Sequence, residues 1–315
     1  MCPEDGGDLH TGSSELRCAE CGREFGLKDG VLALLPDRLA HVADGGSGSG
    51  SDPAVVWIQE ELRWWNPWFE TVSSAPYSPK SGLRGRAREL HLLRHVRGEL
   101  GESPLVVEMG AGTSRTIAGL WAPAAHGLRY VATDISRPAL VAGRGILGPS
   151  AASVQCDAVG WPVREGVADV VVVLGVLHHV SDWPAALERA CRAVRPGGFL
   201  LLHEAVTKPR VLGRFRSEGV DDHWVSPHEG DVAESALRAA LDGTGTVLRW
   251  RRELSPLRFG MERWLINKRG LDDRLERSRA LTVVFDGLDQ AFGQTLGRVV
   301  PSLGFNEVSV VWRRD

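Results

Sequence analysis

The stretch Leu105-Val106-Val107-Glu108-Met109-Gly110-Ala111-Gly112-Thr113-Ser114 decides the fold of this chain. A short apolar run is followed by an acid and then by two glycines that a single residue separates. This order predicts a buried parallel strand that ends in a tight turn, where glycine lets a ligand approach the backbone. A helix is expected to begin near Ser114, where its free N–H groups favour a carboxylate or another anion. Because the acid would repel a diphosphate, the turn favours a cationic amino-acid ligand, although an ordinary strand-to-helix turn also fits.

The composition is that of a soluble globular protein. The 315 residues are 43% hydrophobic and 24% charged, enough for one large core and a small accessory module. A net charge of −3 and a pI near 6.4 predict no general attraction to nucleic acid or to an anionic membrane. The sequence shows neither an apolar run of membrane-spanning length nor a signal pattern at its N-terminus. We therefore expect a cytoplasmic protein without a membrane partner.

Three regions differ in composition. Residues 1–40 contain short elements and three of the five cysteines. Residues 41–103 include a Gly/Ser linker at 45–51, which is flexible by composition, and continue as a Trp-rich helical cap. Residues 104–315 form the main domain, in which 206–300 are expected to contain substrate-side insertions.

Aromatic residues crowd the segment from Trp57 to Phe69. Their helical spacing predicts a helix that Pro67 ends. The rings either pack into a core or form a lid over a neighbouring pocket, and both interpretations remain open.

Apolar runs that are typical of strands alternate with helical patterns from residue 105 onward. The predicted strands are 105–109, 129–134, 153–156, 169–174 and 198–204. Between the last two, Asp182 to Val194 places its apolar residues on one helical face, and Pro196-Gly197-Gly198 ends this helix. The alternation predicts an α/β fold with a doubly wound, Rossmann-like, mostly parallel sheet. The later predicted elements are helices near 232–242 and 282–297 and strands at 246–252 and 308–313.

Polar residues follow four of these strands, at the sheet edge where parallel folds bind ligands. Asp134 lies 22 residues past Gly112, close to the distance at which an acid meets a ribose hydroxyl pair. Asp157 after the third strand is placed to accept a hydrogen bond from an exocyclic amine. Together with the glycine turn and the Gly175–His179 segment after the fourth strand, these residues predict a nucleoside-containing ligand.

The segment from about 104 to 205 resembles the core of class I S-adenosylmethionine-dependent methyltransferases, in the small-molecule, methyltransferase-11-like branch. The resemblance implies a seven-stranded sheet with an antiparallel last strand, expected here at 308–313, and S-adenosylmethionine as the cofactor. The motifs that carry it are Glu108-Met-Gly110-Ala-Gly112, Val131-Ala-Thr-Asp134-Ile, Val154-Gln-Cys-Asp157-Ala, Asp169-Val-Val-Val-Val-Leu-Gly-Val-Leu-His178-His179-Val and Arg192-Ala-Val-Arg195-Pro196-Gly197-Gly198. The cofactor-binding residues expected from it are Glu108, Gly110, Ala111, Gly112, Asp134, Ile135, Asp157, Ala158, Leu174 and Gly175.

Histidines near the fourth and fifth strands are candidates for the catalytic base. A hydroxyl acceptor must lose its proton, and histidine is the natural base near neutral pH. We favour His179 as the base, with His178 and Glu204 as rivals, although a histidine that caps a helix or binds backbone fits equally well. A polar cluster at 221–229 fits a substrate loop, a solvated loop or a divalent metal site.

Cys18-Ala-Glu-Cys21-Gly22 has the spacing of a zinc knuckle, whose partner half here is Cys2-Pro3-Glu4-Asp5. Residues 1–36 resemble the zinc-ribbon module that accompanies some methyltransferases, except that Asp5 stands where the pattern has its second cysteine. A carboxylate oxygen can bind zinc, His10 could substitute, or the ion could have been lost. We expect a structural zinc ion on Cys2, Asp5, Cys18 and Cys21.

The leading functional hypothesis is methyl transfer to a small molecule, on an oxygen of a specialised metabolite or of a sugar-like acceptor. An RNA methyltransferase of the ribosomal-RNA type is the first alternative, since a zinc ribbon can contact RNA and the stretch 84–97 is basic. The acidic pI disfavours this nucleic-acid partner. A cofactor-binding enzyme of altered chemistry, such as a cyclase, and a non-enzymatic scaffold also remain open, as does a homo-oligomer.

Overall fold

The computed structural model describes most of the chain. The described residues are 1–11, 15–43, 52–72, 96–114, 117, 127–148, 151–207, 226, 232–254 and 306–315. The predicted linker at 45–51, the predicted helix at 282–297 and all of the polar cluster at 221–229 except Ser226 lie outside them. So does most of the helix expected after Ser114.

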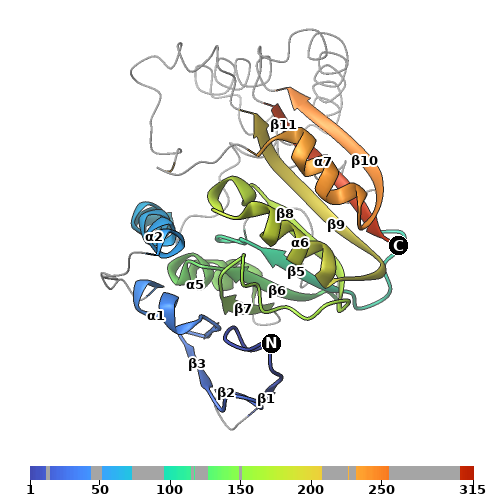
Figure 1. Cartoon of the computed structure of the whole chain (residues 1–315). Helices are drawn as coiled ribbons and strands as arrows, with labels where there is room; N and C mark the ends of the chain where they lie inside the picture. The colour runs from blue at the N-terminus through green and yellow to red at the C-terminus, as the bar shows by residue number, and fades with distance from the viewer. Residues whose placement is uncertain are drawn as a thin grey trace, which may run out of the picture.

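A mostly parallel sheet forms the centre of the molecule (Figure 1). Its strands are β5 (Leu105–Met109), β6 (Arg129–Asp134), β7 (Ala151–Gln155), β8 (Ala168–Leu174), β9 (Val194–Thr207), β10 (Gly245–Leu254) and β11 (Asn306–Arg314). Their order across the sheet is β7-β6-β5-β8-β9-β11-β10. Strands β5 to β9 pair in parallel, whereas β11 is antiparallel to both of its neighbours. The predicted doubly wound architecture and its antiparallel last strand are confirmed.

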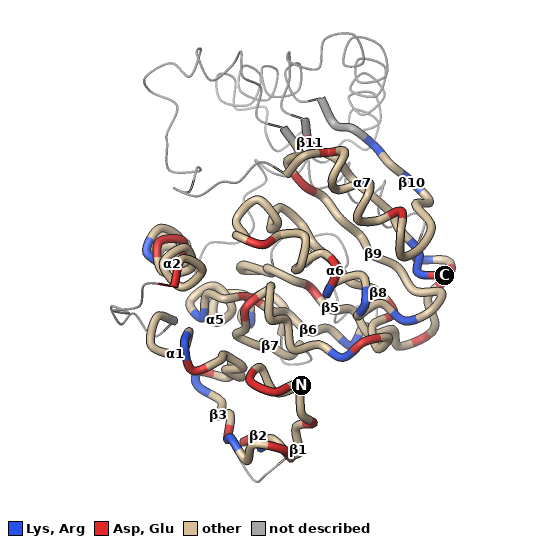
Figure 2. The backbone as a smooth tube through the Cα atoms, in the orientation of Figure 1, with Lys and Arg blue, Asp and Glu red and all other residues tan. Residues whose placement is uncertain are grey.

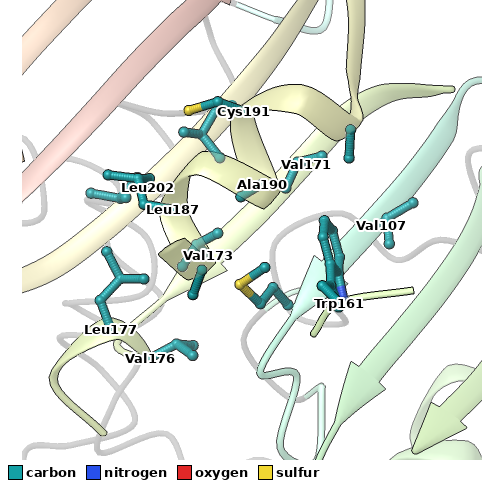
Figure 3. Packing of buried hydrophobic residues seen from close by; sticks show 14 of the residues in the cluster. Val107, Trp161, Val171, Val173, Val176, Leu177, Leu187, Ala190, Cys191 and Leu202 are labelled. Atoms are coloured by element: carbon teal, nitrogen blue, oxygen red, sulfur yellow. The ribbon is translucent and has the colours of Figure 1, made fainter. Parts of the chain in front are cut away.

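The sheet is buried on both faces, as a parallel sheet must be. Alternate residues of one strand belong to different hydrophobic clusters: Val107 packs with Val171 and Val173, whereas Val106 packs with Val170. Helix α6 (Trp183–Ala193) covers the first face, and Figure 3 shows its side chains against the strands. Helix α5 (Arg137–Leu147) contributes to the second cluster.

Helix α6 begins where its N-cap signal indicates and ends at Ala193, before the predicted end signal Pro196-Gly197-Gly198, which lies within β9. The Asp182 side chain accepts a hydrogen bond from the backbone N–H of Ala185 at 3.2 Å, as an N-cap residue does. Strand β9 follows without a gap and begins at Val194, earlier than the predicted strand. A register irregularity in its pairing with β8 accommodates Pro196 and the two glycines.

The first forty residues join the same sheet. They contain β1 (Leu9–Thr11), β2 (Glu15–Cys18), β3 (Glu24–Lys28), β4 (Val31–Ala33) and helix α1 (Asp37–Ala43). Strand β4 pairs in parallel with β7, so the sheet continues through β4, β3 and β2 to β1. The buried side chains of Cys2, Cys18 and Phe25 belong to the main core cluster. The first forty residues thus share the sheet and the core of the main domain, because the apolar run that includes β4 adds a strand to the central sheet.

Helix α2 (Pro53–Val72) continues past Pro67, so the predicted end of this helix is wrong. A proline inside a helix removes one backbone donor and normally kinks or ends the helix. Here Pro67 lies on the exposed face, and Trp65 on the turn before it contacts Trp68 and Phe69 on the turn after it, with ring centroids 5.9 and 6.0 Å apart. This packing favours continuation.

Helix α7 (Glu234–Asp242) lies beside β10, and its leucines complete the core on that side. Among the described residues, no helix combines the length and hydrophobicity that crossing a bilayer requires. Acidic and basic residues are interspersed over the described part of the backbone, as Figure 2 shows. Arg192, for example, pairs with both Glu165 and Glu188.

Candidate functional site

A cavity of about 560 Å³ opens at the carboxyl ends of β5, β6, β7 and β8. Ligands bind at this edge in open α/β sheets. Helix α2 forms the opposite wall with an aromatic face. The predicted cofactor residues that line the cavity are Gly110, Ala111, Gly112, Asp134, Ile135, Asp157, Ala158, Leu174 and Gly175. The structure therefore gathers side chains from four strand ends around one space.

The turn after β5 requires glycine at Gly110. This residue has a φ of 64°, and a Cβ atom there would lie 2.4 Å from a methyl carbon of Val176. No side chain fits at such a distance, so the backbone and Val176 can approach each other only because this position is glycine. The N–H of Ala111 donates to the carbonyl oxygen of Thr133 at 2.8 Å, which ties the turn to β6.

Asp134 at the end of β6 holds this turn in place. One carboxylate oxygen accepts a hydrogen bond from the N–H of Gly112 at 2.7 Å, and the other accepts one from the N–H of Ser136 at 2.8 Å. Burial raises the pKa of Asp134, although these backbone hydrogen bonds oppose the rise. Since a carboxylate oxygen has two lone pairs, each oxygen can accept one further hydrogen bond from a ligand.

Asp157 follows β7, the neighbour of β6, and also lines the cavity. Its two oxygens accept hydrogen bonds from the N–H groups of Val159 and Gly160 at 3.2 and 3.3 Å. Arg38 of α1 lies 4.0 Å from the same carboxylate and also lines the cavity. The N-terminal region thus contributes a cation to this wall, which the sequence patterns did not indicate.

Glu108 does not line the cavity. Its side chain is buried and accepts a hydrogen bond from the Tyr130 hydroxyl on the neighbouring strand β6. Burial raises the pKa of Glu108 to about 8 despite this hydrogen bond. The structure does not bring the predicted cofactor-binding carboxylate to the cavity, and Glu108 instead supports the strand from within the core.

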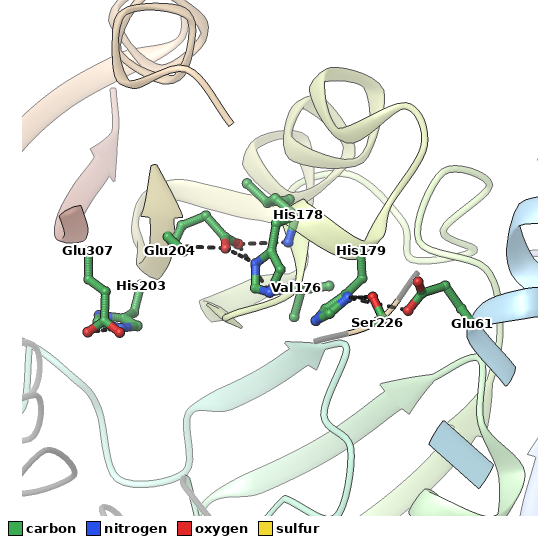
Figure 4. A network of polar contacts seen from close by, with 10 residues as sticks. Glu61, Val176, His178, His179, His203, Glu204, Ser226 and Glu307 are labelled. Atoms are coloured by element: carbon green, nitrogen blue, oxygen red, sulfur yellow. Dashed lines mark hydrogen bonds and ion pairs between the residues drawn. The ribbon is translucent and has the colours of Figure 1, made fainter. Parts of the chain in front are cut away.

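The three predicted catalytic residues lie close together, but only His179 lines the cavity (Figure 4). His178 and His179 form the short 3-10 turn Leu177–His179 after β8, with ring centroids 4.0 Å apart. Nδ1 of His178 pairs with one oxygen of Glu204 in β9. The other oxygen of Glu204 accepts the N–H groups of Val176 and Leu177 at 3.1 and 2.7 Å.

Glu204 therefore binds the turn that carries the histidines. It is fully buried, and although burial raises its pKa, the hydrogen bond and charge of His178 hold the pKa below its ordinary value. The charged carboxylate binds the backbone N–H groups of the turn and the ring of His178, and these contacts hold both in place. The geometry gives the pair a supporting role and leaves His179 facing the ligand space.

Helix α2 contributes a residue that the sequence interpretation missed. Glu61 is 6% exposed and lines the cavity. One of its oxygens, Oε2, accepts a hydrogen bond from Nε1 of Trp65 at 3.0 Å and lies 3.3 Å from Nδ1 of His179. Its spacing of four residues from both Trp57 and Trp65 already placed this acid on the aromatic face of the helix. An acid on an otherwise apolar helical face was the available signal.

The predicted metal ligands form a second site in the N-terminal region. The ligand atoms of Cys2, Asp5, Cys18 and Cys21 all lie within 4.8 Å of one another. Sγ of Cys2 is 3.8 Å from Sγ of Cys21, and Sγ of Cys18 is 3.4 Å from a carboxylate oxygen of Asp5. Two thiolates at zinc–sulfur distances of about 2.3 Å in a tetrahedral site are about 3.8 Å apart, so these distances suit zinc. His10, the alternative ligand, is not part of this cluster.

Comparisons with known proteins match the segment whose strand ends line the cavity. Residues 107–202 match the family model described as a methyltransferase domain. A demethylmenaquinone methyltransferase of Mycolicibacterium gilvum is 34% identical over 114 residues, which are 36% of this chain and 47% of that protein. A highly reducing polyketide synthase of Aspergillus aculeatus is 31% identical over 164 residues, 48% of this chain and 7% of that protein. The chain thus spans at most about half the length of these curated relatives.

Two solved structures share the fold. The geranyl diphosphate C-methyltransferase from Streptomyces coelicolor A3(2) has a TM-score of 0.55 at 14% identity, covering 85% of this chain and all of that one (100%). The [4+2]-cyclase SpnF has a TM-score of 0.51 at 15% identity, covering 82% of this chain and 96% of that one. At such identities the likeness concerns the fold alone.

Proposed function

We propose that this chain, whose residues 107–202 form an S-adenosylmethionine-dependent methyltransferase domain, transfers a methyl group to an oxygen atom of a small molecule. A specialised metabolite or a sugar-like compound is the acceptor in this proposal. The observation that carries it is the gathering of nine predicted cofactor residues and His179 around one cavity. The cofactor supplies an electrophilic methyl carbon on a sulfonium, and the protein must hold the acceptor in line with it and exclude water.

The lining residues fit this cofactor. The turn at Gly110 has no room for a side chain, which leaves its backbone open to the methionine part of the ligand. Asp134 has two lone pairs left for the ribose hydroxyls, and Asp157 can accept a hydrogen bond from the adenine amine. Asp134 and Asp157 come from the ends of neighbouring strands, so they can bind two parts of one nucleoside.

His179 is the proposed general base. It lines the same cavity as the cofactor residues, whereas His178 is paired with Glu204. A neutral imidazole accepts the hydroxyl proton as the acceptor oxygen attacks, and such a base contributes roughly 10²- to 10⁴-fold to a rate. This role predicts that His179→Ala reduces turnover far more than cofactor affinity.

Calorimetry with S-adenosylhomocysteine tests the cofactor site directly. We expect one binding site per chain, and we expect labelled methyl groups from S-adenosylmethionine to appear in an O-methylated small-molecule product. Binding without any methylated product would instead favour altered chemistry such as a cyclase. Absence of binding to the folded protein would contradict the proposal.

A small-molecule acceptor agrees better with the charge of the cavity than RNA does. The lining includes Glu61, Asp134, Asp157 and Asp182, whereas Arg38 is the arginine among its described residues. Such a surface repels a phosphate backbone. Salt-dependent retention of the chain on immobilised ribosomal RNA would contradict this choice of acceptor.

A structural zinc ion on Cys2, Asp5, Cys18 and Cys21 is the second part of the proposal. The spacing of the three sulfur atoms and the carboxylate supports it. Bound there, zinc would cross-link the start of the chain to the turn after β2. Metal analysis of protein purified without added zinc should give about one zinc per chain, and a stoichiometry near zero would remove the site from the proposal.

A further inference from the structure

We propose that Glu61 is a positioning residue for His179, and that helix α2 and His179 together form an acceptor subsite for an uncharged, ring-bearing hydroxyl compound. This inference rests on the proposed function, because it assigns a partner to the proposed base and a chemical class to the acceptor. Glu61 and helix α2 lie outside the matched segment 107–202, whereas His179 lies inside it.

The first observation is the contact between Glu61 and His179. Nδ1 of His179 lies 3.3 Å from Oε2 of Glu61 and 3.0 Å from Oγ of Ser226, and Figure 4 shows the three side chains converging. Both oxygens are acceptors for an N–H group at Nδ1. With the proton held at Nδ1, the lone pair of a neutral imidazole lies on Nε2 and is free for the hydroxyl proton of an acceptor.

The second observation is that the carboxylate of Glu61 is buried. Burial raises the pKa of Glu61, but hydrogen bonds with His179, Ser226 and Trp65 oppose this effect, and the pKa lies below its ordinary value. Glu61 is therefore ionised at neutral pH. An ionised group inside a protein is costly unless it is paired, and its partners here are those that orient His179.

Helix α2 fixes His179 from other directions as well. Nε1 of Trp57 donates a hydrogen bond to the carbonyl oxygen of His179 at 2.8 Å. The Trp65 ring meets the His179 ring edge to face, with centroids 5.4 Å apart. Three residues on successive turns of one helix thus contact the same histidine, which makes α2 a part of the catalytic site as well as its cover.

The chemical class of the acceptor follows from this wall of the cavity. Trp65, Trp68 and Phe69 present aromatic rings to it, and flat apolar rings pack well against such surfaces. Oε1 of Glu61 is buried and has no hydrogen-bond partner among the described residues. Because the reacting hydroxyl donates its one proton to Nε2 of His179, Oε1 has to be satisfied by a different polar hydrogen, and the charge of Glu61 would repel an acceptor carboxylate.

The proton and electron balance of the step is complete. The acceptor oxygen forms a bond to the methyl carbon while the sulfur–methyl bond breaks, and the bonding pair stays on sulfur. The hydroxyl proton passes to Nε2 of His179, which becomes an imidazolium. Glu61 stabilises that cation through Nδ1–H and receives no proton itself.

The experiment compares wild type, Glu61→Gln, Glu61→Asp and Glu70→Gln, the last changing an exposed carboxylate of the same helix. Nitrogen NMR of labelled histidine, with His179→Gln used to assign the signal, should show the Nδ1–H tautomer in wild type. In Glu61→Gln the amide can donate to Nδ1, so the tautomer should shift to Nε2–H. Glu61→Asp should retain the wild-type tautomer in part, and Glu70→Gln in full.

Turnover is measured with 2-naphthol as the probe acceptor. Glu61→Gln should lower kcat about 10²- to 10⁴-fold, with S-adenosylhomocysteine affinity unchanged. Tryptophan fluorescence should show 2-naphthol binding at least about tenfold more tightly than 3-hydroxy-2-naphthoate, which adds only a carboxylate. Tighter binding of the carboxylate compound, or no binding of 2-naphthol, would overturn the acceptor class.

Failure of this inference is distinguishable from failure of the proposed function. If Glu61→Gln keeps the tautomer and the turnover while His179→Ala loses turnover, the positioning role is wrong and the base assignment stands. If His179→Ala keeps full turnover, the base assignment itself is wrong. Loss of S-adenosylhomocysteine binding in Glu61→Gln would show a structural role in place of a positioning role.

Discussion

Replacement of Asp134 is the most direct test of the cofactor pocket. Its carboxylate accepts the N–H groups of Gly112 and Ser136 at 2.7 and 2.8 Å and has two lone pairs left for the ribose. A hydrogen bond to a charged group contributes about 1.5–3 kcal/mol. Because the two ribose bonds share one carboxylate and do not add fully, Asp134→Ala should cost about 2–4 kcal/mol of binding, roughly 30- to 1,000-fold in Kd.

Asp134→Asn separates the ribose contacts from the support of the turn. The amide keeps one acceptor oxygen and replaces the other with a donor, which opposes the N–H of Gly112 or of Ser136. Its affinity should therefore lie between those of wild type and Asp134→Ala. Both variants should also unfold more easily, since each leaves a backbone N–H without its partner at a cost of about 1–3 kcal/mol.

Calorimetry with S-adenosylhomocysteine, at a temperature where circular dichroism shows full folding, measures the binding change alone. Asp242→Ala, at the exposed end of α7, is the control and should bind like wild type. Unchanged affinity in fully folded Asp134→Ala would refute the assignment of this carboxylate to the ribose.

Three further outcomes follow from the structure. Chemical denaturation should show that Gly110→Ala destabilises the chain by at least about 1 kcal/mol more than Gly148→Ala. Both glycines have a positive φ, but only at Gly110 would the added Cβ atom clash with a neighbour, the side chain of Val176. The pKa of Glu108 is about 8 in the folded chain, against an ordinary value of 4.5. Between these values the folded chain holds a proton that the unfolded chain releases, so the contribution of this group to folding stability is full below pH 4.5 and is lost as the pH rises to 8. Glu108→Gln should therefore gain stability over wild type by up to about 1.4 kcal/mol per pH unit across that window in denaturation curves, and an equal slope in both would contradict the burial effect. Chelation of zinc should lower the Tm of wild type but not of Cys18→Ser, and equal melting of treated and untreated wild type would show that no structural ion is held.

The residues that line the cavity at the strand ends could be predicted because each is encoded locally. A strand that ends in a turn places its last polar residue at the edge where parallel strand ends converge, so Asp134 and Asp157 needed no knowledge of their neighbours. Glu108 differs because side chains alternate along a strand. Val106 packs in one core cluster and Val107 and Met109 in the other, so Glu108 points toward the side of Val106. Attention to that alternation would have separated Glu108 from the turn residues.

Long-range pairing could not be predicted in the same way. The parallel partner of β4 is β7, far along the chain, and no turn sequence joins the two. The contact of Glu61 with His179 likewise depends on how α2 docks against the sheet. Burial of an acid on an apolar helical face indicates a partner but does not identify it.

Part of the site lies within one continuous segment of the chain, and part comes from segments that are distant in sequence. This division explains why the cofactor is more readily identified than the acceptor. The predicted cofactor residues that line the cavity all fall within the matched segment 107–202. Three residues that contact the His179 side chain, namely Glu61, Trp65 and Ser226, lie outside it. On the proposed function, the matched segment would hold the methyl donor, and helix α2 and Ser226 would complete the base and bound the acceptor. Acceptor choice could then change through α2 and Ser226 while the donor pocket stays the same.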